Sequence, residues 1–193
     1  ERDTPEVARG VAATAAAPPT HGHQHPGPPG ALPPESPGSC RKLYRALLLP
    51  GVLDLEPGET LTIRTPIGRR PHPLLGTIWC AADGSAAGDL PACSHVTLLE
   101  RNAAADLVTV AIATGRPHQI RIHCASVGAP LLADPLYGIG GGAVATALPG
   151  DGGYRLQAWR LSLQRPDGPR LELEVAQPLT ASHGRGLCVN INK

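Results

Sequence analysis

The sequence has no phenylalanine and no methionine in its 193 residues, and only two tryptophans and three tyrosines. With so few aromatic rings, any hydrophobic core must be built from aliphatic side chains. The absence of methionine also bears on the first residue, because translation starts with methionine. We therefore expect Glu1 to result from processing or to lie within a longer chain, and we favour the second interpretation.

Long apolar runs are also absent. No segment approaches the length of a membrane span, and no apolar segment of a secretory signal is present. The five cysteines are odd in number and form no Cys-x-x-Cys pair. This pattern indicates reduced thiols rather than a disulfide framework. We expect an intracellular protein, in the cytoplasm, the nucleus or an organelle, with no membrane partner.

Proline and charge divide the chain. Nine of the 22 prolines fall in residues 1–39, which have little apolar bulk and which we expect to be disordered. Residues 40–180 are long enough for one folded domain, and residues 181–193 match no pattern and are interpreted as a tail. The formal net charge of +1 suggests no partner by itself. Residues 40–193 are mildly basic, which permits RNA binding without demonstrating it.

Alternation of apolar and polar residues predicts several strands. They cover residues 59–65, 95–100, 107–113, 155–164 and 170–176. Residues 41–49 are apolar and short, so the pattern leaves strand and helix open. Residues 71–92 show no period and are interpreted as an irregular connection. Apolar residues at helical spacing predict one helix over 117–127. Strands on both sides of one helix indicate an α+β fold around a mainly antiparallel, mixed β-sheet.

Polar side chains gather where this helix begins. Arg116 and Arg121 supply forked donors, and the unpaired N–H groups of a helix start favour an anion. The side chains of Ile120 and Cys124 are expected to face the core, so Cys124 is not interpreted as a nucleophile. Locally, the pattern fits a generic anion site as well as helix-end groups bonded to water or backbone. No His-Glu-x-x-His motif or other ligand spacing is present, so we expect no metal and no cofactor.

Residues 114–123 read TGRPHQIRIH. Three further segments accompany it. KLYRA at 42–46 and TPIGR at 65–69 precede it in the chain, and GAPLLADPLYG at 128–138 follows it. YRLQAWRL follows downstream. Together these motifs resemble the RluA-type RNA pseudouridine synthases, whose signature is TGRTHQIRVH followed by GHPILGDPLYG. The resemblance covers about residues 41–178 and implies a partial pseudouridine synthase-like catalytic domain.

The resemblance also implies a reaction and roles. The family isomerises uridine to pseudouridine in RNA, without a cofactor, through an aspartate nucleophile. Tyr44 would be the tyrosine that packs on the base, and Arg121 the arginine that pairs with the nucleophilic aspartate. An arginine beside an aspartate keeps it ionised, and an aromatic ring stacks an extruded base. Five residues are candidates for RNA binding: Lys42, Arg116, His118, Gln119 and His123. The partner would be ribosomal or transfer RNA, and we expect a monomer.

The chain departs from the family in one major respect. The nucleophile of the family lies in an HRLDxxTSG segment before the K-x-Y motif, and this sequence contains no such segment. Ala129 and Gln157 also replace two histidines of the family pattern. Asp134 precedes a proline and is expected to hold a turn through its own backbone. Two hypotheses remain: a synthase whose nucleophile lies upstream of this sequence, inactive as printed, or a non-catalytic RNA-binding relic.

Overall fold

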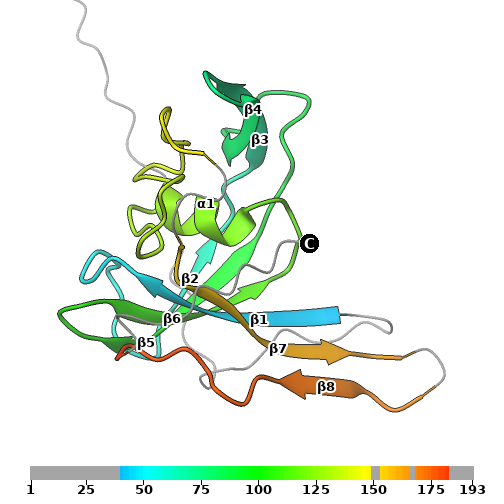
Figure 1. Ribbon diagram of the computed structural model, residues 1–193. Coiled ribbons are helices and arrows are strands. Elements are labelled where there is room, and N and C mark those ends of the chain that lie inside the picture. The colour runs from blue at the N-terminus through cyan, green and yellow to red at the C-terminus, as the bar shows by residue number, and fades with distance from the viewer. Residues whose placement is uncertain (1–39, 149–152, 166–167, 183–193) are drawn as a thin grey trace, which may run out of the picture.

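The computed structural model describes residues 40–148, 153–165 and 168–182 (Figure 1). The segment 1–39, which we predicted to be disordered, lies outside the described residues. So do residues 183–193 of the predicted tail and part of the turn between the last two predicted strands. No helix in the described residues is long and apolar enough to cross a membrane.

Six strands form the main sheet, in the order β2-β5-β6-β1-β7-β8. Their bounds are β1 Cys40–Leu48, β2 Thr60–Ile63, β5 Ser94–Arg101, β6 Asp106–Ile112, β7 Leu156–Leu163 and β8 Leu171–Glu174. Every strand pair described in this sheet is antiparallel. The predicted α+β class with a mainly antiparallel sheet is confirmed, and the five strands predicted from alternation are all present.

The segment that the sequence left open, residues 41–49, is the central strand β1. It pairs with β6 on one side and β7 on the other, with an irregularity in the β7 register between Leu43 and Tyr44. Its last three residues, 46–48, are fully buried. A central strand that is covered on both faces has no alternation of polar and apolar residues. This explains why the period could not distinguish a strand from a helix.

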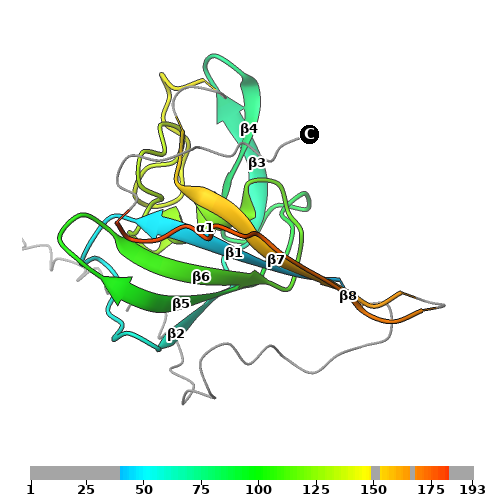
Figure 2. The ribbon, with the colours of Figure 1, turned by 60° about the horizontal axis from the view of Figure 1, so that its bottom comes forward.

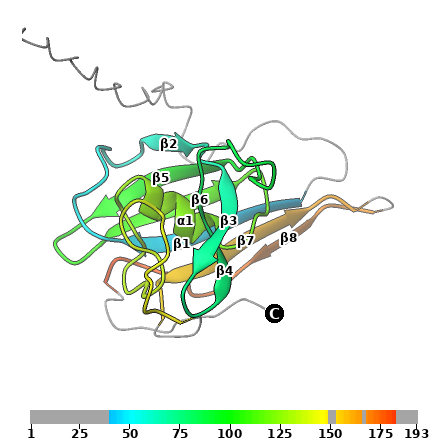
Figure 3. The ribbon, with the colours of Figure 1, turned by 90° about the horizontal axis from the view of Figure 1, so that it is seen from above.

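One helix, α1 (Gln119–Ser126), covers the middle of the sheet. Seen from above, it lies over β6 and β1 (Figure 3). Ile120 and Cys124 join the aliphatic core formed with the sheet, as expected. The helix starts two residues later than predicted, because His118 adopts a left-handed backbone conformation with a φ of 53° and so becomes the N-cap. Burial raises the pKa of the Cys124 thiol to about 12, which excludes a thiolate nucleophile at neutral pH.

A hairpin that the sequence did not predict stands apart from the main sheet (Figure 2). Strands β3 (Ile67–His72) and β4 (Gly76–Ala81) pair antiparallel within it. The prediction of an irregular connection over 71–92 is therefore wrong for its first part. Pro71 and Gly76 interrupt the strand pattern, and the hairpin is held by contacts with distant residues. Ile67 and Ile78 pack with Ile122 and Leu136 in a second hydrophobic cluster under the hairpin.

Candidate functional site

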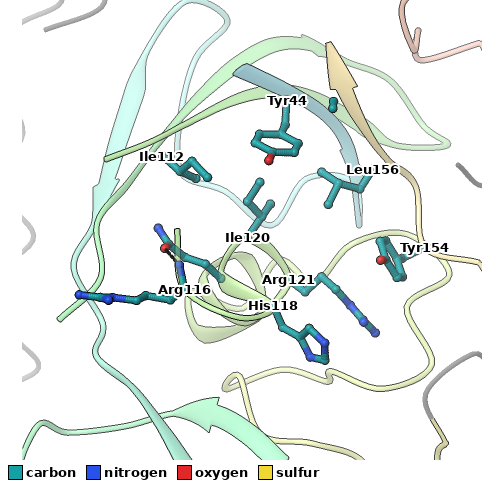
Figure 4. Close-up of a pocket in the computed structure, with 10 residues that line it drawn as sticks. Tyr44, Ile112, Arg116, His118, Ile120, Arg121, Tyr154 and Leu156 are labelled. Carbon is teal, nitrogen blue, oxygen red and sulfur yellow. Dashed lines mark hydrogen bonds between the residues drawn. The ribbon is translucent and has the colours of Figure 1, made fainter. Parts of the chain in front are cut away.

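A pocket of about 130 Å³ lies where β6 turns back into α1 (Figure 4). It takes side chains from β1, β6, the 113–118 turn, α1 and the start of β7. The lining residues are Tyr44, Ile112, Arg116, His118, Gln119, Ile120, Arg121, Tyr154, Leu156 and Ala158. The fold thus brings five of the seven residues predicted from the sequence to one cavity, from segments that are far apart in the chain.

Arg121 is held in the pocket by a carboxylate and by two aromatic rings. Its Nε and Nη2 donate to the two carboxylate oxygens of Asp134 at 2.7 and 2.6 Å. Its guanidinium carbon also lies 4.9 Å from the ring centre of Tyr137 and 4.1 Å from that of Tyr154. Only 9% of the Arg121 side chain is exposed. The third nitrogen, Nη1, makes no hydrogen bond to any residue that the structure describes.

Asp134 has two functions in this arrangement. As predicted, it holds a turn: its Oδ1 accepts from the backbone amides of Leu136 and Tyr137, at 2.9 and 3.2 Å. It is also the partner of Arg121, which the sequence analysis had not foreseen. The Asp134 side chain is fully buried and does not line the pocket. Its carboxylate is therefore committed to the turn and to Arg121.

His118 lies beside Arg121 at the N-terminal end of α1 (Figure 4). Its Nδ1 is 2.6 Å from the hydroxyl of Tyr137, and that hydroxyl donates to the carbonyl of Trp79 at 2.8 Å. The imidazole and the Tyr137 ring meet edge to face, with centres 5.6 Å apart. Burial, and then the nearby positive charge of Arg121, lower the pKa of His118. The imidazole is therefore neutral at pH 7.

Tyr44 and Arg116 border the other parts of the pocket. Tyr44 is partly buried on β1, and burial, followed by the nearby Cys40, raises the pKa of its hydroxyl. The phenol therefore stays protonated at neutral pH and can donate a hydrogen bond. Arg116 holds the 113–118 turn against the chain before β5 by donating from its Nε to the carbonyl of Pro91 at 3.0 Å. Its other guanidinium nitrogens remain available to an anion.

Gln119 lines the pocket, but its side chain is fully used in the fold. Its Oε1 accepts from the Thr114 hydroxyl and the Arg116 amide, at 2.8 and 3.0 Å. Its Nε2 donates to the Cys93 carbonyl and to the Ser94 hydroxyl, both at 2.9 Å. These four bonds tie the turn before α1 to the start of β5. The predicted RNA contact by Gln119 does not fit this geometry, because no donor or acceptor is left over.

His123 and Lys42 are not in the pocket. His123 is fully buried, with Nδ1 2.9 Å from the Ser94 hydroxyl and Nε2 2.9 Å from the Thr65 carbonyl. A direct RNA contact by His123 is therefore incompatible with the structure, and its role is to join α1 to β5 and to the segment before β3. Lys42 is exposed on β1, outside the pocket lining. Its predicted role in RNA binding stays a prediction.

Sequence reasoning missed Tyr154 and the β7 side chains Leu156 and Ala158. A signal for Tyr154 was present, because the chain has only three tyrosines. All three lie at this site: Tyr44 and Tyr154 line the pocket, and Tyr137 contacts Arg121 and His118. Within the described residues, no group of three or more His, Cys, Asp or Glu side chains could hold a metal ion.

Comparison with solved structures defines the class of protein. The fold resembles the human RNA pseudouridylate synthase domain containing 1, with a TM-score of 0.52 and 23% identity over 74% of this chain and 57% of that one. The human domain containing 4 gives a TM-score of 0.50 at 18% identity, over 75% of this chain and 60% of that one. The chain therefore has the fold of the pseudouridine synthases.

Curated relatives give the family. The chain is 44% identical to a protein of Synechocystis named as an uncharacterized RNA pseudouridine synthase, over 63% of this chain and 40% of that protein. It is 40% identical to RNA pseudouridine synthase 5 of Arabidopsis thaliana, over 72% of the chain and 42% of that protein. Ribosomal large subunit pseudouridine synthase D of Neisseria meningitidis is 33% identical, over 75% of the chain and 38% of its own length. No family model matches.

These relatives show that the chain is homologous to part of proteins named RNA pseudouridine synthases, among them a synthase D of the RluA type, and the solved structures show that it shares their fold. The resemblance inferred from residues 114–123 and the motifs around them is therefore confirmed. The chain spans about two fifths of the length of these three curated relatives.

Proposed function

We propose that this chain is the part of an RNA pseudouridine synthase that receives the target uracil and presents the arginine to the nucleophile. The observation that carries the proposal is the pocket in which Tyr44 and Arg121 meet. In the reaction, the bond between nitrogen 1 of uracil and the sugar breaks, the base turns, and carbon 5 is joined to the sugar; carbon 5 loses its proton and nitrogen 1 gains one. No cofactor is needed, because the uracil ring itself is the group that moves.

Tyr44 and Arg121 take different parts in this proposal. The Tyr44 ring packs on the base, and its protonated hydroxyl can donate a hydrogen bond within the pocket. The Nη1 of Arg121 supports the ionised form of an incoming carboxylate by donating to it. Because Asp134 already holds Nε and Nη2, the guanidinium is oriented before any carboxylate arrives. Such preorganisation reduces the reorganisation needed in the transition state.

The nucleophile is proposed to lie outside the printed sequence. Asp134 is the acidic residue nearest to Arg121, but its carboxylate is buried and bonded to Arg121 and to two amides. A nucleophile needs a carboxylate that reaches the sugar. The printed sequence has no HRLDxxTSG segment. We therefore propose that the chain as printed makes no pseudouridine and that an upstream segment supplies the aspartate.

A second candidate function is an RNA-binding relic without activity. The ion pair between Arg121 and Asp134 favours it, because Arg121 is neutralised in the absence of any nucleophile. Under either hypothesis we propose ribosomal or transfer RNA as the partner, contacted by Arg116 and Lys42, and a monomer in solution. We also propose an intracellular location, which is compatible with the free thiols of the four described cysteines.

The test is an assay for pseudouridine in uridine-containing RNA. The purified chain is compared with a protein extended upstream by its native coding sequence. We expect product only from the extended protein, and loss of that product when the aspartate of its HRLD segment is changed to Asn. An extended protein with no such segment and no product would favour the relic. Turnover by the printed chain would refute the proposed position of the nucleophile.

A further inference from the structure

His118 has a backbone conformation that is uncommon outside glycine. Its φ of 53° lies in the left-handed region, which only a few per cent of non-glycine residues adopt, Asn, Asp and His more often than the others. It is the N-cap of α1, but its side chain makes no capping hydrogen bond to the helix. The left-handed conformation of His118 is therefore not explained by a capping hydrogen bond to α1. Instead, it directs the imidazole to Tyr137 and into the pocket lining. Strain of this kind is concentrated at functional sites.

The bond to Tyr137 fixes which nitrogen of His118 carries the proton. A tyrosine hydroxyl has one hydrogen, and Tyr137 donates it to the carbonyl of Trp79 at 2.8 Å. In its contact with His118, at 2.6 Å, the Tyr137 oxygen must therefore accept. Nδ1 is the donor in that contact and holds the proton. In a neutral imidazole, Nε2 is then left with a lone pair, so it is an acceptor.

This acceptor is open to a ligand. The Nε2 of His118 has no hydrogen-bond partner among the described residues, and His118 lines the pocket together with Tyr44 and Arg121. His118 and Arg121 also pack on the same Tyr137 ring, and both line the pocket. Phosphate oxygens are acceptors and cannot pair with a second acceptor. A contact between Nε2 of His118 and an RNA phosphate therefore does not fit this tautomer, whereas an N–H or O–H donor does.

We propose that the Nε2 of His118 accepts a hydrogen bond from the N3–H of the target uracil and so helps to select uracil. The inference rests on the proposed function, since it assumes that the pocket receives the base. Uracil carries a hydrogen on N3, whereas the N3 of cytosine has none and is itself an acceptor. A cytosine in the same position would place two lone pairs against each other. His118 is thus a specificity-determining residue.

Direct binding to labelled RNA tests the proposal. The purified chain is titrated, at low salt and pH 7.5, with single-stranded decauridylate and with the same decamer built from N3-methyluridine. Methylation removes the N3–H and keeps the stacking ring. We expect the wild type to bind decauridylate about tenfold more tightly, since one hydrogen bond to a neutral group contributes on the order of a tenfold change in affinity.

Substitutions test whether His118 causes the difference in affinity between decauridylate and its N3-methylated form. In His118→Phe we expect the ratio of the two affinities to fall to about one. His118→Gly provides the same test with a residue that tolerates the left-handed backbone, should the first variant fold poorly. Tyr137→Phe removes the group that fixes the tautomer, so the ratio should fall while decauridylate still binds. The control is His95→Gln, a half-buried histidine of β5 outside the pocket, and it should keep the wild-type ratio.

Two results would overturn the inference. One is equal affinity of the wild type for both decamers, including no binding of either. The other concerns a third decamer, decadeoxyuridylate, which lacks the ribose 2′-hydroxyls. If it bound more weakly than decauridylate while N3 methylation had no effect, the donor to His118 would be a 2′-hydroxyl and not the N3–H. The proposed function is decided separately, by pseudouridine formation in the upstream-extended protein. Product from that protein, together with equal affinities here, would refute the role of His118 alone.

Discussion

Arg121 illustrates how single residues define this site. A carboxylate holds one edge of its guanidinium, and the rings of Tyr137 and Tyr154 lie within cation–π distance. A buried ion pair contributes little net stability compared with apolar packing, but removing one partner leaves a buried charge without compensation. The Arg121–Asp134 pair should therefore matter more for the position of the arginine than for overall stability, as long as both partners are present.

The first prediction concerns this pair. Asp134→Ala should lower the free energy of unfolding by about 3–5 kcal/mol, because it leaves the guanidinium unpaired and two turn amides without an acceptor. Urea denaturation gives the measurement. The control is Glu174→Ala, which removes the partner of Arg160 in an exposed pair and should have little effect. Similar losses in the two variants would contradict the assigned importance of Asp134.

Arg116 leads to the second prediction, on RNA affinity. Its Nε is bonded to Pro91, and its side chain borders the pocket but points away from Tyr44 and Ile120 (Figure 4). Arg116→Ala should weaken binding to RNA of any sequence and reduce the slope of log K against log salt by about 1, because one phosphate contact is lost. A salt titration of RNA binding measures both. Unchanged affinity at low salt would remove Arg116 from the RNA surface.

Stability should depend on pH through three histidines. Burial is the main cause that lowers the pKa of His95, His118 and His123 below 6.5 in the folded protein. The unfolded chain therefore binds protons first as pH falls. Their contribution is fully present above about pH 6.5 and is lost progressively as pH decreases toward the lower folded values. The carboxylates whose pKa is lowered titrate at more acidic pH and do not act in this window.

We therefore expect a lower free energy of unfolding at pH 5.5 than at pH 8, measured by urea denaturation at both. His123→Gln can keep the bond to Thr65 but does not titrate, so it should be less stable at pH 8 and show a smaller difference between the two pH values. If the wild type were equally stable at pH 8 and 5.5, the histidines would not be protected from protonation by the fold.

Among the elements, α1 connects the two parts of the molecule. Ile120 and Cys124 pack on the main sheet, whereas Ile122 and Ala125 pack under the β3–β4 hairpin. Nearly the whole helix is therefore buried, which is unusual for a helix of eight residues. The loop after Tyr137 joins the same contact through Gly141, whose carbonyl accepts from the Ala81 amide at the end of β4.

Gly141 provides a prediction at this scale. Its φ is +74°, and an added Cβ would lie 2.8 Å from the Cβ of Ala81 and 3.0 Å from the carbonyl oxygen of Ile122. Gly141→Ala should thus destabilise the fold by about 2 kcal/mol or more, through backbone strain and steric overlap. Its neighbour Gly142 has open space around it, so Gly142→Ala is the control. Thermal unfolding of both variants gives the comparison, and equal melting temperatures would contradict the close approach.

At the scale of the whole molecule, the described core begins with β1. Among the residues that the structure describes, the hydrophobic clusters of the main sheet, α1 and the hairpin are built from β1 onward. Deleting residues 1–39 should therefore leave the melting temperature unchanged within about 2 °C, since a proline-rich segment with little apolar surface contributes little burial. Scanning calorimetry of the two proteins measures this. A decrease of several degrees would show that the segment is docked.

The sequence by itself determined the strands with clear alternation, the region of the helix and the family, because these depend on local periodicity and on a contiguous motif. The hairpin β3–β4 and the strand character of β1 depend on burial by distant residues, and only the tertiary structure decided them.

The site, too, was determined partly by the sequence and partly by the tertiary structure. The motif placed Arg116, His118 and Arg121 together, but the pairing of Arg121 with Asp134, the burial of His123 and the contribution of Tyr154 arise from the way the chain folds back on itself. Side-chain partners across such distances follow from topology and packing, which no local pattern encodes.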